Sequence, residues 1–400
     1  MLNAFVYDGL RTPIGRHGGA LAKIRPDDLL AEAMKSVMAR SQFKIEQVED
    51  IVVGCGNQSG EDSRCVARHA GLSAGFPIEI PGTVLQRNCA SGLGALAHAA
   101  HSITAGEGDV FIVGGVESMS RSPILMSRGE TPFARDIKFY DSTIGPRFSN
   151  PKLTKQFGDP QMPQTADNLA REYNITREQA DEFALSSQSK YAAALAAGFF
   201  AGEIAPLELP PTRKGPVPPV TADEHPRPST DMATLAKMKP LYEGGVTTAG
   251  NASGVNDGAI ALVVGSLAAG EKAGAKPIAR VIASAAMGVQ PHIMGIGPVA
   301  ASQKVLARAG LSIKDIDVIE INEAFAAQVL ACLKGLGVDA HDSRVNPNGG
   351  AIALGHPLGV SGARIALTAV RQLHRTGGRY ALVSLCIGGG QGMAVILERV

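Results

Sequence analysis

Short apolar runs alternate with longer helical patterns along the whole chain. Runs with the length of buried strands are Ile51–Val53, Val110–Val113, Ile260–Val264 and Tyr380–Leu385. Apolar residues recur at helical spacing between them, over Asp28–Arg40, Gly92–Thr104 and Gly362–Arg375. Strands and helices that alternate in this way predict an α/β fold built in layers.

One strand-and-helix pattern occurs twice. Segment Phe43–Gly54 has the same pattern as Leu311–Asn322, at an offset of 268 residues. In both copies a Ser-Gly pair then opens a predicted helix, at Ser91 and at Ser361. Two copies in the same order predict two similar halves that are related by an approximate two-fold axis.

The segment between the two copies has a different composition. It contains the proline-rich run Pro210–Pro219 and only a few clear helical patterns, such as Arg177–Ala197. Prolines lack the backbone donor that a sheet interior requires, so this run cannot lie inside a sheet. We interpret residues 121–248 as an inserted loop domain, of the kind that often carries a binding surface. Residues 1–120 with 249–274 then form the first half, and residues 275–400 form the second.

Composition narrows the class of protein. The 38 Lys and Arg residues balance 37 Asp and Glu residues, so charge gives no reason to expect nucleic acid or an anionic membrane as a partner. No apolar run has the length of a membrane span, and the N-terminus does not resemble a secretory signal. The five cysteines show no metal-binding spacing, so we expect no metal site and a reducing, cytoplasmic location.

Two predicted turns carry a cysteine and a histidine. Cys89 directly precedes a helix, where backbone N–H groups and the helix dipole are expected to lower the pKa of its thiol; alternatively, it fills space at the helix start. His356 lies in the equivalent loop of the second copy. As a lone residue it would be a turn histidine, but the two-fold axis would bring it close enough to activate Cys89.

Two further candidates follow predicted strands of the second half. Cys386 precedes a glycine run whose backbone N–H groups could hold an oxyanion while a second thiol moves a proton. The run could also cradle phosphate, but it lacks the G-K-[ST] ending of a P-loop. Asn322 and Glu323 stand at a strand's carboxyl end, where α/β sheets place ligand contacts, although such residues also cap helices.

Taken together, four motifs resemble those of the thiolase family. They are CAS at 89–91, NEAF at 322–325, GHP at 355–357 and CIG at 386–388, in the family's order. The likeness extends from Arg11 to the C-terminus. It implies an α/β fold with a five-layered αβαβα core made of two similar halves, and a loop domain over the active site.

The resemblance also implies a role for each candidate residue. Cys89 would take the acyl group, and His356 would deprotonate it. Cys386 would act as acid or base at the α-carbon of acetyl-CoA. Asn322, through a bound water, and His356 would hold the enolate oxygen. Backbone N–H groups of Cys89 and Gly388 would form a second oxyanion hole.

By the same resemblance, coenzyme A is a co-substrate, no cofactor is bound permanently, and the chain self-associates as a homodimer or homotetramer. The implied contacts of coenzyme A are Met162, Arg227, Thr234, Ser253 and Phe325. Arg227 would meet the adenine nucleotide end, while Ser253 and Phe325 would flank the pantetheine and the acyl group.

The substrate is suggested by two segments. Phe139–Pro151 and Asn57–Asp62 look most like 3-oxoadipyl-CoA thiolases, which form succinyl-CoA and acetyl-CoA. Pro146 stands where that subgroup typically has Trp, so acetoacetyl-CoA or a broad range of short- to medium-chain 3-oxoacyl-CoA substrates stays an alternative. Arg147 either pairs with the distal carboxylate of 3-oxoadipyl-CoA or is a solvated loop arginine.

Two other functions share this expected scaffold. A decarboxylating 3-oxoacyl synthase pairs its cysteine with two histidines, or with His and Asn, and lacks a second catalytic thiol. A non-catalytic acyl-CoA carrier would not need Cys89 and His356. NEAF together with CIG at 386–388 favours a thiolase over the synthase, and the presence of both Cys89 and His356 argues against the carrier.

Overall fold

The structure is a computed structural model that describes residues 1–211, 213 and 215–400. Thr212 and Lys214, in the proline-rich run, lie outside the described residues. The strands of the first half are β1 (Ala4–Arg11), β2 (Gly15–Arg16), β3 (Asp50–Gly54), β4 (Gly82–Leu85), β5 (Val110–Ser118) and β8 (Asn256–Gly265). Those of the second half are β9 (Ala279–Gly288), β10 (Val318–Ile321), β11 (Tyr380–Ile387) and β12 (Gln391–Arg399). All four predicted strands are present.

Both halves have the same strand order. It is β3-β5-β8-β1 in the first half and β10-β11-β12-β9 in the second, and β4 lies beyond β3. In each set the first pair is parallel and the next two pairs are antiparallel. The two sets join where β1 pairs with β9, over the short stretch Ala4–Val6. The predicted pair of similar halves is therefore present in the strand topology.

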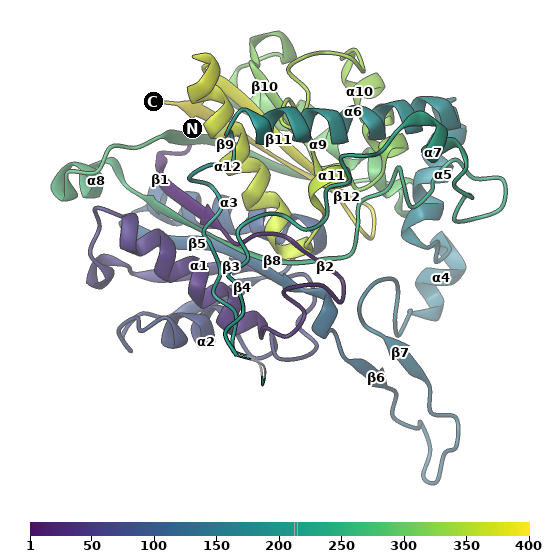
Figure 1. Ribbon diagram of the computed structural model, residues 1–400, viewed down its shortest axis with the longest axis horizontal. Coiled ribbons are helices and arrows are strands. Elements are labelled where there is room, and N and C mark those ends of the chain that lie inside the picture. The colour runs from purple at the N-terminus through teal and green to yellow at the C-terminus, as the bar shows by residue number, and fades with distance from the viewer. Residues whose placement is uncertain (212, 214) are drawn as a thin grey trace.

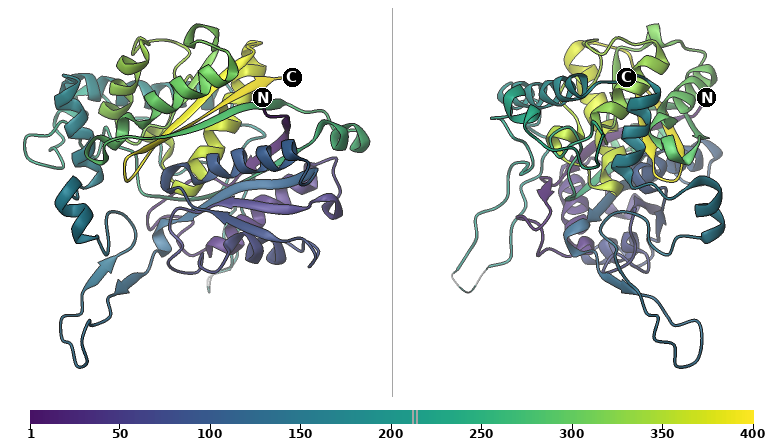
Figure 2. Two further views of the ribbon diagram at one scale, coloured as in Figure 1. Left: turned by 180° about the vertical axis from the view of Figure 1, so that it is seen from behind. Right: turned by 90° about the vertical axis from the view of Figure 1, so that its right-hand side faces the viewer.

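Helices form three layers around the two sets of strands (Figures 1 and 2). The central layer consists of α3 (Ser91–Ala105) and α12 (Leu358–Thr376). The outer layers are α1 (Pro26–Arg40) and α2 (Val66–Ser73) on the first half, and α9 (Gly297–Ala309) and α10 (Ala326–Leu336) on the second. Two short helices, α8 (Leu267–Ala273) and α11 (Ala351–Leu354), lie in connections.

Alternation along the buried strands explains this layering. On β3, Val52 packs into the central core with α3 and α12, whereas Ile51 and Val53 pack against α1 and α2. On β11, Val383 faces the central core and Leu382 faces α9 and α10. Because successive side chains of a strand point to opposite faces, each apolar strand needs a helical layer on both sides. The five-layered αβαβα core is thereby confirmed.

The central helices cross at their first turns through glycine. A Cβ atom at Gly92 would lie 2.4 Å from the carbonyl oxygen of Gly359, and one at Gly362 would lie 2.4 Å from the backbone nitrogen of Leu93. No larger residue permits so close an approach of two backbones. Gly92 and Gly362 are equivalent in the repeat, so the loops that precede the two helices meet near the two-fold axis.

The segment between β5 and β8 carries its own elements. They are β6 (Ile124–Met126), β7 (Phe139–Asp141), α4 (Pro151–Phe157), α5 (Met162–Glu172), α6 (Arg177–Ala196) and α7 (Met232–Ala236). Strands β6 and β7 form a hairpin that projects from the body (Figure 1). Helices α5 and α6 pack on the second half beside α10. The described residues of Pro210–Pro219 belong to no strand of either sheet, as their prolines predict.

All five cysteines are free thiols. Within the described part of the chain, the search for a helix long and apolar enough to cross a membrane finds none.

Candidate active site

Cys89 lies in a tight turn that directly precedes α3. The turn is the 3-10 helix η2 (Asn88–Ala90). The N–H of Arg87 donates to the Ser91 hydroxyl oxygen at 2.9 Å, and that hydroxyl donates to the Asn88 carbonyl at 2.7 Å. These bonds hold the half-buried Cys89 at the end of the central layer. The backbone N–H groups of Cys89 and Gly388 lie close enough to the sulfur to favour its thiolate form.

The expected low pKa of Cys89 is wrong. Burial raises the pKa of the thiol to about 11, and the two N–H groups offset this only in part. Burial destabilises the thiolate by more free energy than the nearby backbone donors restore. Resting Cys89 is therefore protonated at neutral pH, and its activation requires a base.

His356 is held as a neutral imidazole with one nitrogen free to accept a proton. Ser361 donates its hydroxyl proton to the Pro357 carbonyl at 3.0 Å, so its oxygen must accept from His356 Nδ1, at 2.6 Å. This assignment leaves Nε2 unprotonated. Burial, and next the charge of Arg364, lower the pKa of His356 to about 3. The Asn256 side chain fixes the loop by accepting from the His356 N–H at 3.0 Å.

Asn322 stands beside His356, as predicted. Its amide Nδ2 donates to His356 Nε2 at 3.4 Å. Its own N–H bonds to the Ser384 carbonyl, which ties the end of β10 to β11. The amide oxygen of Asn322 is buried and has no partner among the described residues. The buried side chain of Asn322 thus presents polar atoms at the imidazole.

Cys386 lies at the end of β11 and is fully buried. Burial raises the pKa of its thiol well above the usual range, and the proximity of Cys89 raises it further. Two thiols from opposite halves therefore lie near one another, and both are protonated at neutral pH. The geometry brings together Cys89, Cys386 and the Gly388 N–H in one place, and Asn322 and His356 in another.

Some predicted contacts of coenzyme A adjoin these residues. Met162 and Phe325 belong to one apolar cluster with Cys386, and a Cβ at Gly388 would lie 3.5 Å from the Met162 sulfur. The N–H of Ser253 bonds to the Ala324 carbonyl, beside Phe325. Arg227 is exposed on the connection between α6 and α7, and Thr234 is exposed on α7. No hydrogen bond among the described residues joins either of them to Cys89, Asn322, His356 or Cys386.

Glu117 connects backbone segments of the two halves next to the site. Its carboxylate accepts from the N–H groups of Gly56 and Gly359 at 2.8 Å and of Asn57 at 3.0 Å. The end of β3 is thereby tied to the start of α12. Burial raises the pKa of Glu117 to about 7, although these three donors favour its charged form.

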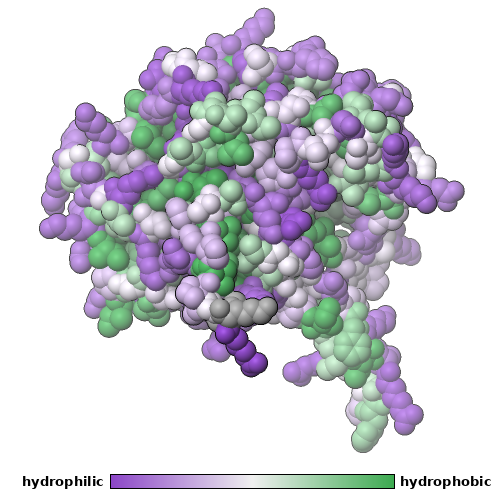
Figure 3. All heavy atoms as spheres, in the orientation of Figure 1, coloured by the Kyte–Doolittle hydropathy of each residue, from purple (hydrophilic) through white to green (hydrophobic). Residues whose placement is uncertain are grey.

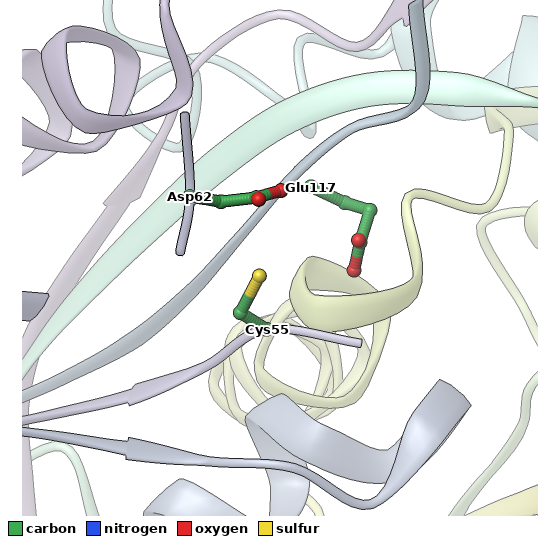
Figure 4. A group of neighbouring side chains, drawn as sticks. All are labelled: Cys55, Asp62 and Glu117. Atoms are coloured by element: carbon green, nitrogen blue, oxygen red, sulfur yellow. The ribbon is translucent and has the colours of Figure 1, made fainter. Parts of the chain in front are cut away.

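Cys55 and Asp62 lie next to this carboxylate (Figure 4). The candidate ligand atoms of Cys55, Asp62 and Glu117 lie within 4.8 Å of one another, a spacing that could suit a cation. Both Glu117 oxygens, however, already accept backbone hydrogen bonds. We therefore assign Glu117 to bracing the two halves.

Sequence reasoning missed four residues that hold the site, namely Asn88, Glu117, Asn256 and Ser361. Each acts through a side-chain bond whose partner is defined by the fold. Two signals were available. Ser361 belongs to the repeated Ser-Gly pair, and asparagine is, among residues other than glycine, one that tolerates the left-handed backbone found at Asn88, where φ is +44°.

The two halves of the chain match the two domains of one family. Residues 4–268 match the thiolase N-terminal domain, and residues 275–399 match the thiolase C-terminal domain. The chain belongs to the thiolase family.

Curated relatives and solved structures share its full length. The chain is 53% identical to the 3-oxoadipyl-CoA/3-oxo-5,6-dehydrosuberyl-CoA thiolase of Escherichia coli K12, and 50% identical to a beta-ketoadipyl-CoA thiolase of Acinetobacter baylyi. Both alignments cover 100% of each chain. Human mitochondrial 3-ketoacyl-CoA thiolase in complex with CoA is 42% identical, with a TM-score of 0.91 over 100% of this chain and 98% of that one.

Proposed function

We propose that the protein is an acyltransferase that cleaves 3-oxoadipyl-CoA with coenzyme A into succinyl-CoA and acetyl-CoA. The observation that supports this most is the proximity of two thiols from opposite halves, Cys89 and Cys386. The substrate is inferred from the names of relatives that are 50–53% identical over the full length. Acetoacetyl-CoA, or a broad range of short- to medium-chain 3-oxoacyl-CoA substrates, is the alternative.

The first half-reaction transfers an acyl group to Cys89. The thiol gives its proton to His356 Nε2, and the sulfur attacks the 3-keto carbon of the substrate. The oxyanion that forms accepts from the N–H groups of Cys89 and Gly388, which already lie close to the sulfur. Cleavage of the C2–C3 bond then releases the enolate of acetyl-CoA and leaves an acyl-Cys89 thioester.

The enolate needs a second set of donors and a proton. His356, now protonated at Nε2, and Asn322, through a water, hold the enolate oxygen. The Cys386 thiol protonates C2, and acetyl-CoA leaves. Coenzyme A then gives its thiol proton to the Cys386 thiolate and attacks acyl-Cys89, and His356 returns its proton to the Cys89 sulfur. A single cysteine could not be both the acylated nucleophile and this acid.

Coenzyme A is proposed to lie along residues 121–248, our predicted loop domain. Met162, Ser253 and Phe325 would adjoin its pantetheine, since they lie beside Cys386 and Gly388. Exposed Arg227 and Thr234 would meet the nucleotide end, where Arg227 offers a cation for phosphate.

Arg147 is the proposed partner of the distal carboxylate. It is half-buried, and its guanidinium donates to the Asn57 side chain at 2.8 Å, next to the end of β3. Among the described residues no carboxylate pairs with it, so it retains donors for a substrate. A charged carboxylate would be costly to bury without such a partner.

This substrate assignment is tested with 3-oxoadipyl-CoA and acetoacetyl-CoA, by following the CoA-dependent loss of 3-oxoacyl-CoA absorbance. The wild type is expected to prefer 3-oxoadipyl-CoA. Arg147→Ala should lower kcat/KM for this substrate about ten- to a hundredfold, the loss expected of one charged hydrogen-bonding partner, and spare acetoacetyl-CoA. The exposed Arg128 is the control, because Arg128→Ala should change neither rate. Preference for acetoacetyl-CoA would contradict the substrate, and equal losses on both substrates would make Arg147 a structural residue.

We also propose that the chain self-associates. The β6–β7 hairpin carries exposed apolar side chains far from the core, and Phe133 at its tip is 99% exposed (Figure 3). Strand β4 ends the sheet, and its outer edge pairs with no strand in the described part of the chain. Isolated edges and apolar arms of this kind favour association.

Light scattering is expected to give a dimer or tetramer of the 41.4 kDa chain. Replacing both Phe133 and Phe139 by serine should lower the mass if the hairpin carries the contact, whereas the exposed Lys138→Ser is the matched control. A wild-type mass of one chain at all concentrations would contradict self-association.

A further inference from the structure

Asn88, the residue before the nucleophile, connects the two halves of the site. Its φ of +44° turns its side chain toward the second half, where its amide Nδ2 donates to the Gly388 carbonyl at 2.9 Å. Gln86 donates to the Asn88 amide oxygen at 2.9 Å, which fixes the orientation of that amide. The same Gln86 amide bonds to the Gly56 carbonyl, so the group is anchored to the end of β3.

The segment that Asn88 contacts has little restraint of its own. The turn between β11 and β12 contains Gly388, Gly389 and Gly390, and φ is +91° at Gly389 and +89° at Gly390. Glycine has the greatest backbone freedom of all residues and no side chain with which to pack. On the second half, the turn is held by bonds from Gly390 N–H to Ile387 and from Val289 N–H to Gly390. Among the described residues, Asn88 supplies the side-chain hydrogen bond that reaches Gly388.

The Asn88–Gly388 hydrogen bond affects the proposed acyl transfer because Gly388 lies next to Cys89. Its N–H is one of two donors that lie close to the Cys89 sulfur, and the other belongs to Cys89 itself. The first donor is carried by the glycine turn and the second by η2. Their separation is therefore fixed only as well as the two loops are fixed to each other.

We propose that Asn88 is a positioning residue. Its hydrogen bond to the Gly388 carbonyl, called the clasp below, sets the spacing of the two N–H groups that hold the oxyanion during acyl transfer to Cys89. This inference rests on the proposed roles of Cys89 and Gly388. It adds a residue that touches no reacting atom and acts through the glycine turn. Oxyanion donors act only when they are held within a few tenths of an ångström, so loss of the clasp slows steps that form an oxyanion.

Two substitutions separate the clasp from the backbone conformation. Asn88→Gly keeps the positive φ and removes the amide. Asn88→Asp keeps the size and the tolerance for that conformation, but places a carboxylate oxygen against the Gly388 carbonyl. If one variant fails to fold, the other still carries the comparison. Asn174, an exposed residue with φ of +52°, is the matched control, through Asn174→Gly and Asn174→Asp.

The experiment compares two reactions of the same thiol, each measured by mass spectrometry of the Cys89 peptide. Acetylation by acetyl-CoA passes through a tetrahedral oxyanion, whereas alkylation by iodoacetamide displaces iodide without forming one. Both Asn88 variants are expected to acetylate about 10- to 100-fold more slowly than wild type and to alkylate at the wild-type rate. In the cleavage assay, kcat should fall while KM for coenzyme A stays nearly constant. The Asn174 variants should match wild type in every measurement.

Two results would contradict the proposed role of the Asn88–Gly388 hydrogen bond. Wild-type acetylation rates in both Asn88 variants would show that the oxyanion hole does not depend on it. Equal losses in acetylation and alkylation would mean that Asn88 acts on the reactivity of the thiol itself. A wild-type enzyme that gains no acetyl group on Cys89 would instead contradict the proposed nucleophile, so the two failures are distinguishable.

Discussion

Cys89→Ser is expected to lower the rate of 3-oxoacyl-CoA cleavage by about a thousandfold or more. A serine hydroxyl is far less acidic than a thiol and is a weaker nucleophile, so it attacks the 3-keto carbon much more slowly. The rate is measured by the CoA-dependent loss of 3-oxoacyl-CoA absorbance. Cys65→Ser, at a half-buried thiol outside the site, is the control and should retain wild-type activity.

The same role predicts a covalent adduct. Wild-type protein incubated with acetyl-CoA should gain an acetyl mass on the peptide that contains Cys89, and Cys89→Ser should not. An acetyl group on Cys386 with Cys89 unmodified would reverse the assignment of the two thiols.

Cys386→Ser is expected to leave acylation of Cys89 intact and to slow proton transfer at the α-carbon of acetyl-CoA. Cys89 should still accept an acetyl group, because its own N–H and that of Gly388 remain in place. Exchange of the acetyl-CoA methyl protons with deuterated water should fall about 10²- to 10⁴-fold, the usual contribution of general acid–base catalysis. Exchange is followed by mass spectrometry of acetyl-CoA.

A second buried thiol supplies the control for this variant. Cys332 donates to the Gly295 carbonyl at 3.1 Å, a bond that a serine hydroxyl can also make, so Cys332→Ser should exchange normally. Unchanged exchange in Cys386→Ser would show that another group moves the proton at the α-carbon.

The architecture was predictable because the repeat can be recognised from short local sequence patterns. Val52 and its neighbours alternate between two apolar faces, and the Ser-Gly pairs at 91 and 361 mark the same helix start twice. Such signals span a few residues and need no knowledge of distant contacts. The same repeat placed Cys89 and His356 in equivalent loops, and symmetry alone predicted that the two residues lie close together.

The electrostatic state of the site was less predictable. The pKa of Cys89 depends on how much protein surrounds the thiol, and burial overrides the helix start that is visible in the sequence. The tautomer of His356 depends on the acceptor to which the Ser361 hydroxyl donates. That acceptor is the Pro357 carbonyl, which is in reach only once the first turn of α12 has formed. The bond from Asn88 to Gly388 joins residues that are 300 positions apart. None of these partners can be found from spacing along the chain.

The glycine crossing of α3 and α12 also bears on how the chain folds. Gly92 approaches Gly359, and Gly362 approaches Leu93, so the contacts join residues that lie far apart in the sequence. Closing so long a loop is slow compared with forming local helices and hairpins. Cys89 and His356, the proposed nucleophile and base, are therefore expected to meet late, after each half has its own core. A nascent chain that has just exposed Cys89 to the cell has neither His356 nor the Gly388 donor, and it cannot consume acyl-CoA. Chemical competence thus arises in a single step, when the two halves dock.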